Sequence, residues 1–184
     1  MKKYIALIIS FHLCIFVSLA QTGQSDIKLE DLINSVNWDN CTESDIIYLY
    51  KDNIVQGEKD VTIDEYTSSK YDIKGVQIGK YHSSWGHIDV HKYTRKLKKI
   101  VLVIDVSEED KKNPELFQSS LEAYLKTFLG DKYHKIIEFG WSNDIECVWD
   151  DNYNIGCGVK TWVVPGSKTA GITIGKGIKY KGIE

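Results

Sequence analysis

The order of apolar patterns along the chain predicts an α+β fold, an antiparallel sheet with helices packed on one of its faces. Two early stretches repeat apolar residues at helical spacing, and most later stretches alternate with the period of two that strands require. One further helical stretch separates two groups of strands. Runs of strands broken by single helices favour α+β, whereas a parallel doubly wound sheet needs strict alternation of strands and helices. We therefore expect an N-terminal helix pair and strands joined as hairpins or a meander.

The first twenty residues have the layout of a secretory signal peptide. Lys2 and Lys3 form a charged start, residues 4–16 are almost all apolar, and Ser18-Leu19-Ala20 supplies small residues before a cleavage site. The apolar run is shorter than the roughly 20 residues that span a bilayer, and no later stretch approaches that length. We expect a protein without a transmembrane segment that is exported to the periplasm or secreted.

The remaining chain suits one domain. We expect a flexible leader over 21–28 and a single α+β domain over 29–184, in which 29–106 and 107–184 are alternatively two similar halves. Removal of residues 1–20 takes away two of the 23 basic residues and none of the 26 acidic ones, which leaves a formal net charge of −5. A general nucleic-acid binder shows a basic surface instead, so we expect no nucleic-acid partner.

Two helices are expected first. Residues 29–38 place Leu29, Leu32, Ile33 and Val36 at helical spacing. A second helix begins after Thr42, where Asp45 completes a variant of the capping box. Its apolar stripe runs to residue 55 and Gly57 ends it.

Strands are expected next over 71–79, with a bulge at Gly75, over 86–93 and over 99–106. The last of these is almost entirely β-branched or apolar, which predicts a central strand buried on both faces. The basic residues that follow the second strand, Lys92, Arg95, Lys96, Lys98 and Lys99, read as a solvated turn, with a phosphate or membrane patch as the alternative.

The clearest helix follows Asn113-Pro114-Glu115, which supplies an N-cap, a proline at the first helical position and an acid in the first turn. Gly130 ends it. Four strands are then expected over 135–139, 144–149, 158–164 and 171–175. Pro165-Gly166 suits a type II turn, so the last two strands are predicted to form a hairpin.

Export permits disulfides, and the mature chain has three cysteines. Cys147 and Cys157 flank a predicted hairpin loop, so we expect them to face each other and to form a disulfide. Cys41 is then left over, either buried or available for a bridge between chains. Pairing of Cys41 with one of the others remains the alternative.

The order of elements, with residues 121–133 leading into strands that carry Trp141, Trp149 and Trp162, resembles small secreted bacterial α+β modules. Among named families it most resembles the β-lactamase-inhibitor-like proteins, in which helix pairs are backed by a sheet. The resemblance covers element order over most of the mature chain and no specific motif. It implies a binding protein and assigns no functional residues.

A row of potential metal ligands lies in residues 83–91, SSWGHIDVH. In a strand His87, Asp89 and His91 stand on one side. The Cβ atoms of His87 and His91 are then about 13 Å apart, whereas zinc lies only ~2 Å from each ligand nitrogen. We therefore expect a solvent-facing row without metal. A His87–Asp89 chelate completed by His82 remains the alternative.

The aromatic residues are the main positive signal for binding. Trp85 lies beside His82 in a polar stretch that reads as a turn, and Tyr153 lies in a predicted hairpin loop, so we assign both to a binding surface. Trp149 and Trp162 alternate with apolar residues and are expected in the core, with a sugar platform or interface anchors as the alternative. The candidate binding residues are Trp85, His82, His87, Asp89, His91 and Tyr153.

No recognisable nucleophile motif, phosphate loop or calcium loop is present in the sequence. We expect a non-enzymatic module without a cofactor that binds another exported or envelope protein, in the manner of an inhibitor or immunity protein, as a monomer or weak dimer. A small-ligand or glycan-binding module is the second hypothesis, and a metal-dependent hydrolase using His82, His87 and His91 is the third.

Overall fold

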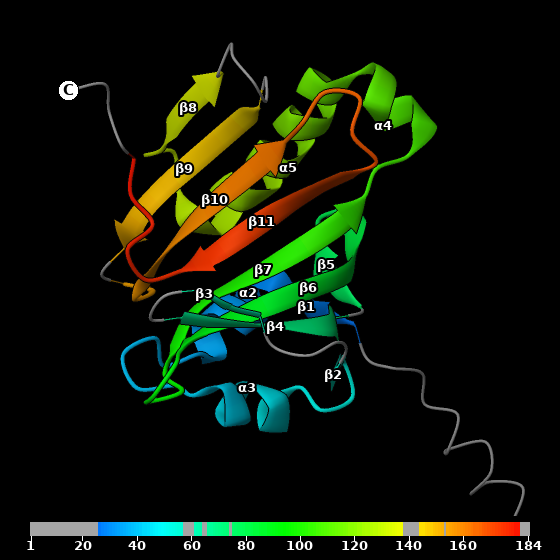
Figure 1. Cartoon of the computed structure of the whole chain (residues 1–184). Helices are drawn as coiled ribbons and strands as arrows, with labels where there is room; N and C mark the ends of the chain where they lie inside the picture. The colour runs from blue at the N-terminus through cyan, green and yellow to red at the C-terminus, as the bar shows by residue number, and fades with distance from the viewer. Residues whose placement is uncertain are drawn as a thin grey trace, which may run out of the picture.

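A computed structural model describes residues 26–56, 61–63, 66–73, 75–137, 144–152 and 154–180. The expected signal peptide lies outside these residues. The described chain has mixed α and β content (Figure 1), built on a curled sheet with the strand order β1-β5-β6-β7-β11-β10-β9-β8. Strand β4 also pairs with β6, and β2 and β3 pair with β4. Every described pairing is antiparallel except that of β1 with β5.

The strands fall into two groups along the chain, one before and one after the long helix. The first group is β1 (Ile27–Lys28), β2 (Ile54–Gln56), β3 (Val61–Ile63), β4 (Tyr66–Ile73), β5 (Val76–Ile78), β6 (Tyr81–His91) and β7 (Leu97–Asp105). The second group is β8 (His134–Ile137), β9 (Ile145–Asn152), β10 (Cys157–Val163) and β11 (Thr169–Gly175). Strand β11 pairs with β7 and so joins the two groups into one sheet.

The helices are α2 (Leu29–Ser35), α3 (Glu43–Leu49), α4 (Glu108–Lys112) and α5 (Pro114–Leu129). Helix α5 starts with Pro114 and ends before Gly130, whose φ of 83° is open to glycine and costly for other residues. Its buried stripe places Phe117, Leu121, Leu125 and Leu129 one turn apart against β9 and β10.

Other helical expectations need correction. The Thr42–Asp45 capping box is present, but α3 ends at Leu49 and the chain re-enters the core as strand β2 from Ile54. A strand buries Ile54 as well as the expected longer helix would, so the apolar pattern fits both. Residues 27 and 28, expected in the leader, form β1. Leu116 is 71% exposed and lies outside the stripe of α5.

Two strand expectations are confirmed and two are wrong. Val101 and Leu102 are both buried on opposite faces of β7, as expected for a central strand. The turn at Pro165-Gly166 is confirmed, since the Ser167 N–H donates to the Val164 carbonyl over 3.0 Å and β10 pairs with β11. Gly75, with φ of 73°, separates two strands rather than forming a bulge within one. The expected turn at 81–86 belongs to strand β6.

The predicted Cys147–Cys157 bridge is wrong. The register of β9 and β10 places Cys147 opposite Thr161 and Cys157 opposite Asn152, so the two cysteines lie at different levels of the hairpin. Both are free and buried, as is Cys41. Burial raises the pKa of Cys41 and Cys147 to about 11 and that of Cys157 to about 12, so all three stay thiols at neutral pH and are poor nucleophiles.

Candidate functional site

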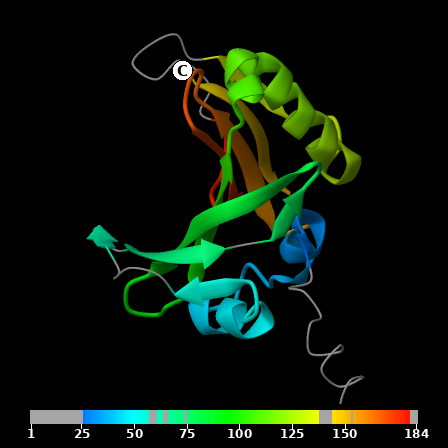
Figure 2. The ribbon, with the colours of Figure 1, turned by 90° about the vertical axis from the view of Figure 1, so that its right-hand side faces the viewer.

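The two faces of the sheet differ in what covers them. Apolar residues of α2, α3 and α5 belong to one core cluster that includes Ile100 and Leu102 of β7. Val101 and Val103 alternate with these residues, are equally buried, and lie outside that cluster. With the strands turned edge-on (Figure 2), α2 and α5 lie on the same side. We call the opposite side of the sheet, to which Val101 and Val103 point, the open face.

The strand register, together with two contacts to α5, shows which residues point to the open face. Thr161 of β10 and Cys147 of β9 point towards α5, because Thr161 contacts Gln118 and Cys147 contacts Glu122. Their strand neighbours therefore point to the open face. Following the pairings across the sheet places these residues on this face: Trp85, His87, Asp89, Lys99, Val101, Val103, His134, Ile136, Glu146, Val148, Gly158, Lys160, Trp162, Gly171, Thr173 and Gly175.

One row of paired residues runs across the strands of the open face and has a tryptophan at each end. Trp162 pairs with Gly171, Gly171 pairs with Val103, and Val103 pairs with Trp85. The row crosses β10, β11, β7 and β6, so the two tryptophan backbones are roughly 14 Å apart at the usual strand spacing. Both side chains are half-buried. The arrangement is an aromatic platform with an apolar centre.

Gly171 makes room for the indole of Trp162. A Cβ atom at position 171 would lie 2.4 Å from Cζ2 and 2.6 Å from Cε2 of Trp162. The indole therefore lies across the Gly171 backbone rather than standing away from the sheet. Only glycine permits this close approach.

Val101, Val103 and Val148 form a thin apolar layer beneath the platform. They are 5%, 1% and 2% exposed and lie outside the core cluster to which the described helices contribute. A partner that packs on this face therefore touches the half-buried Trp85 and Trp162 rather than these valines.

Charged pairs border this apolar centre. Lys160 binds Glu146 over 2.5 Å, and Lys99 binds the buried Asp89 over 2.9 Å. His87 Nε2 lies 3.7 Å from Asp89 Oδ1. Burial lowers the pKa of His87, although Asp89 acts in the opposite direction. Each described cation of the open face thus lies beside an acid of the same face, and the face is close to neutral.

The structure brings together three of the six candidate binding residues. Trp85, His87 and Asp89 lie on the open face, but Asp89 is buried rather than solvent-facing as expected. His82 pairs with Asp26 over 3.6 Å at one end of β6. His91 lies at the other end, where its Nδ1 accepts hydrogen bonds from the backbone of Tyr93 and Thr94.

Tyr153, the sixth candidate, lies outside the described residues. His91 lies nine residue steps of extended strand from His82, which is roughly 30 Å, so these two histidines cannot share a metal ion. Within the described ranges, no three His, Cys, Asp or Glu side chains gather closely enough to hold one.

Trp162 is the residue for which the preferred expectation, a place in the core, was wrong and the alternative of an exposed binding face fits the register. Trp149 is 3% exposed and lies in the core as expected, but Trp162 belongs to the open face. The available signal was the spacing of Trp162 and Gly171 on either side of the Pro165-Gly166 turn, which brings the two residues opposite each other.

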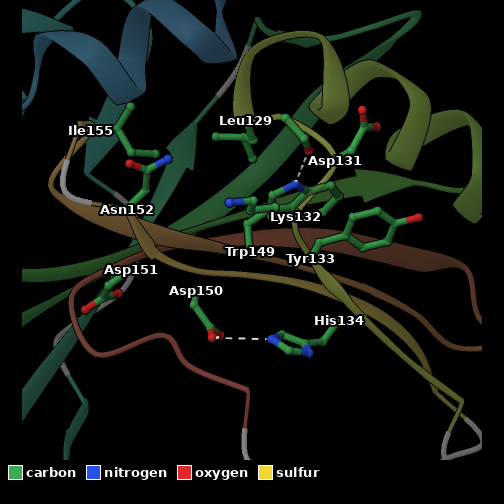
Figure 3. Close-up of a pocket in the computed structure, with 11 residues that line it drawn as sticks. Leu129, Asp131, Lys132, Tyr133, His134, Trp149, Asp150, Asp151, Asn152 and Ile155 are labelled. Atoms are coloured by element: carbon green, nitrogen blue, oxygen red, sulfur yellow. Dashed lines mark hydrogen bonds and ion pairs between the residues drawn. The ribbon is translucent and has the colours of Figure 1, made fainter.

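A separate cavity of about 790 Å³ lies at the C-terminal end of α5 (Figure 3). Leu129, Tyr133, Trp149, Asp150 and Ile155 are among its lining residues. The ring of Tyr133 stacks on Trp149 at 4.8 Å and also has the Lys126 ammonium 4.8 Å from its centroid. The Nε1–H of Trp149 donates to the Gly130 carbonyl. These aromatic rings are therefore engaged within the protein.

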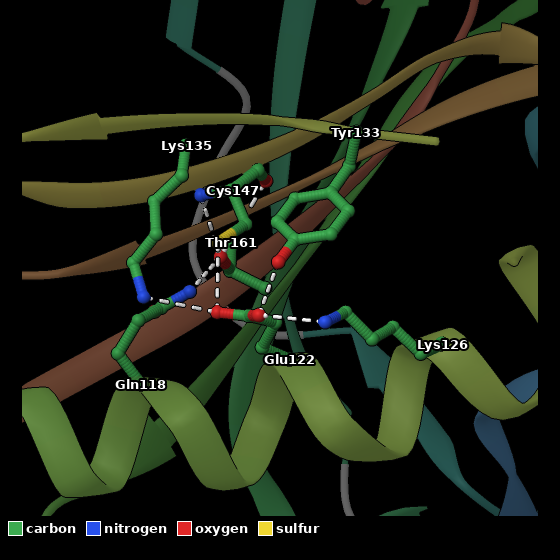
Figure 4. A network of polar contacts seen from close by, with 7 residues as sticks. All are labelled: Gln118, Glu122, Lys126, Tyr133, Lys135, Cys147 and Thr161. Atoms are coloured by element: carbon green, nitrogen blue, oxygen red, sulfur yellow. Dashed lines mark hydrogen bonds and ion pairs between the residues drawn. The ribbon is translucent and has the colours of Figure 1, made fainter. Parts of the chain in front are cut away.

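A polar network joins α5 to the sheet beside this cavity (Figure 4). Glu122 accepts hydrogen bonds from Tyr133, Lys126 and Lys135, the lysines at 3.0 and 3.1 Å. Burial acts to raise the pKa of Glu122, but the three hydrogen bonds outweigh it and lower the pKa to about 2. The network holds α5 against β8 and β9.

Because of this network, the free energy of unfolding should fall as the solution becomes acidic. The pKa of Glu122 is lowered in the folded protein, so its contribution is complete above about pH 4.5 and is lost as the pH falls towards about 2. Solvent reaches both lysines, so we expect only about 1–2 kcal/mol from this carboxylate. Urea unfolding at about pH 6 and about pH 3 should show a larger loss in the wild type than in Glu122→Gln. Glu109→Gln, at an exposed acid of α4, should lose as much as the wild type; equal losses in all three proteins would contradict the assignment.

None of the described helices has the length and apolar character that a membrane crossing requires. Comparisons of the chain with protein-family models, with curated proteins and with solved structures found no match.

Proposed function

We propose that the chain is an exported, non-catalytic binding module that engages another exported or envelope protein through its open face. In this proposal an N-terminal helix pair and α5 pack on the opposite face of the sheet. The observation that carries it is the row Trp162–Gly171–Val103–Trp85, two tryptophans that flank an apolar centre on a sheet face without helix cover.

The composition of the open face favours a protein partner. Binding energy at protein interfaces concentrates in a few residues, with tryptophan among the most frequent, and a polar border excludes water from them. The ion pairs Glu146–Lys160 and Asp89–Lys99 supply such a border. The resemblance in element order to the β-lactamase-inhibitor-like proteins implies the same class of function.

A small-ligand or glycan-binding module is the second candidate. The cavity at the end of α5 is large enough for a small molecule, and its lining includes Trp149, Tyr133 and Asp150. We rank this function second because Trp149 is 3% exposed and the ring of Tyr133 is already stacked and covered, which leaves little aromatic surface for a sugar.

The test compares the mature chain, residues 21–184, with its Trp85→Ser/Trp162→Ser variant as baits for exported proteins of the source cell. We expect a saturable protein partner whose affinity falls at least about 100-fold in the variant, since two interface tryptophans are removed. Isothermal titration with the purified partner measures the change.

The control is Leu116→Ser, which removes an exposed apolar side chain from α5, on the other side of the sheet, and should bind as the wild type does. Circular dichroism verifies that each variant is folded. A partner held equally by both variants would place the interface elsewhere, and binding of a glycan or small molecule alone would favour the second candidate.

A further inference from the structure

One end of the molecule is formed by α3 and the turn between β6 and β7. Both lie at the lower end of Figure 1 and again in Figure 2. The Glu43 N–H donates to the Arg95 carbonyl over 3.2 Å, and the side chains of the same two residues form an ion pair. The backbone of Thr42 forms an isolated antiparallel β-bridge with Lys96. These contacts fix the helix against the turn. We call this end the tip, made of Tyr48, Leu49, Lys92, Tyr93, Arg95 and Lys96.

The tip carries most of the large apolar side chains that the described residues expose. Five such side chains are exposed in all, and three belong to the tip: Tyr48 at 80%, Tyr93 at 79% and Leu49 at 51%. Ile46 of the same helix is fully buried, so α3 turns one side to the core and presents Tyr48 and Leu49 to solvent. Tyr48, Leu49 and Tyr93 lie outside the strands that form the open face.

Cations accompany these apolar side chains. Residues 92–99 contain five cations and no acid, in a mature chain with a formal net charge of −5. Lys92 and Lys96 are exposed, and the Lys92 ammonium lies 5.5 Å from the ring centroid of Tyr93. Two acids of this region are paired with cations, Glu43 with Arg95 and Asp39 with Lys176, whereas Asp45, which caps α3 through Thr42, remains an exposed anion.

We propose that the tip binds the surface of an anionic membrane. Tyr48, Leu49 and Tyr93 enter the interfacial region, and Lys92 and Lys96 contact the headgroup phosphates. Amphipathic aromatic rings favour the level of the headgroups, and basic residues beside them gain from the negative surface potential of anionic lipids. A nucleic acid or an acidic peptide would use the cations but gives no reason to expose Leu49 as well.

Vesicle co-sedimentation of the mature chain tests the proposal. This chain lacks the apolar residues 1–20, which would bind vesicles by themselves. We expect binding to vesicles of phosphatidylglycerol and phosphatidylcholine in equal parts, and little binding to phosphatidylcholine alone. Lys92→Gln/Lys96→Gln should weaken binding at least about tenfold, since each basic residue at such a surface contributes about fivefold. Leu49→Ser/Tyr93→Ser should weaken it by a similar factor.

Matched controls separate the tip from general properties of the chain. Lys112→Gln/Lys168→Gln removes the same charge from exposed lysines elsewhere, and Leu116→Ser removes an equally exposed apolar side chain from α5. Both controls should bind as the wild type does. Absence of binding to the anionic vesicles would overturn the proposal, and so would binding that the Leu49→Ser/Tyr93→Ser change leaves intact, because that pattern describes a simple polyanion site.

Discussion

Replacing Gly171 with alanine should destabilise the fold by about 3 kcal/mol, the upper end of the usual range for an overpacked core. The added Cβ would lie 2.4 Å from Trp162 Cζ2 and 2.6 Å from the Leu102 carbonyl oxygen. The indole can rotate away at the cost of its packing. The carbonyl belongs to the backbone of β7 and can move only if the β7–β11 pairing yields. Urea unfolding of the wild type and Gly171→Ala measures the loss.

Repeating the Gly171→Ala change in a Trp162→Ala protein separates the clash with the indole from the clash with the Leu102 carbonyl. In Trp162→Ala the indole is absent, so a further Gly171→Ala change meets only the Leu102 carbonyl. We expect this step to cost less than in the wild type, and the difference measures the packing of Trp162 against Gly171. The same variants report on function, since Gly171→Ala moves Trp162 off the platform and should weaken partner binding. An alanine tolerated without loss of stability would mean that the indole does not lie across Gly171.

The sequence predicted elements whose signals are local. Helix α5 was expected after Asn113-Pro114 and before Gly130, and it spans Pro114–Leu129. The β10–β11 hairpin followed from Pro165-Gly166, two residues whose backbone preferences define the turn by themselves. Neither signal depends on the rest of the fold.

Elements with ambiguous patterns were predicted wrongly. Ile46, Tyr50 and Ile54 suit the stripe of a helix, but a short helix followed by a turn and a strand buries the apolar members equally well. The polar stretch at 81–85 gives no alternation because β6 has a register shift between Ser83 and Trp85. Ser83 is buried there, where its hydroxyl donates to the Ile73 carbonyl and accepts from the Val76 N–H. A serine placed to satisfy backbone groups looks like a turn residue in the sequence.

The candidate site was predicted only in part for a related reason. Trp85 was assigned to binding, but its partner Trp162 was assigned to the core because it alternates with apolar residues. Alternation separates the two faces of a strand and does not say which face is covered by helices. That depends on which side α5 packs, a long-range contact that pairs Gln118 with Thr161, 43 residues away.

This contact between α5 and β10 gives the second large effect. Thr161→Val should destabilise the protein by about 2–4 kcal/mol, because it leaves two buried donors without an acceptor. The Thr161 hydroxyl oxygen accepts from Gln118 Nε2 over 2.7 Å and from the Cys147 N–H over 3.0 Å. Thr161 and Gln118 are both 0% exposed, so water cannot replace the lost oxygen without opening the interface. Thr173→Val, a half-buried threonine on the open face, is the matched control and should change stability little.

Removal of both partners should cost less than the single change suggests. Gln118 Oε1 has no hydrogen-bond partner among the described residues, so this amide already carries one unsatisfied buried atom. Gln118→Leu in the Thr161→Val background removes the amide and leaves only the Cys147 N–H unpaired. We therefore expect the double variant to regain about 1–2 kcal/mol relative to Thr161→Val, a coupling that a double-mutant cycle by urea unfolding resolves. Strictly additive losses would instead show that Gln118 and Thr161 contribute independently, and that α5 is held to the sheet by its apolar stripe and the Glu122 network alone.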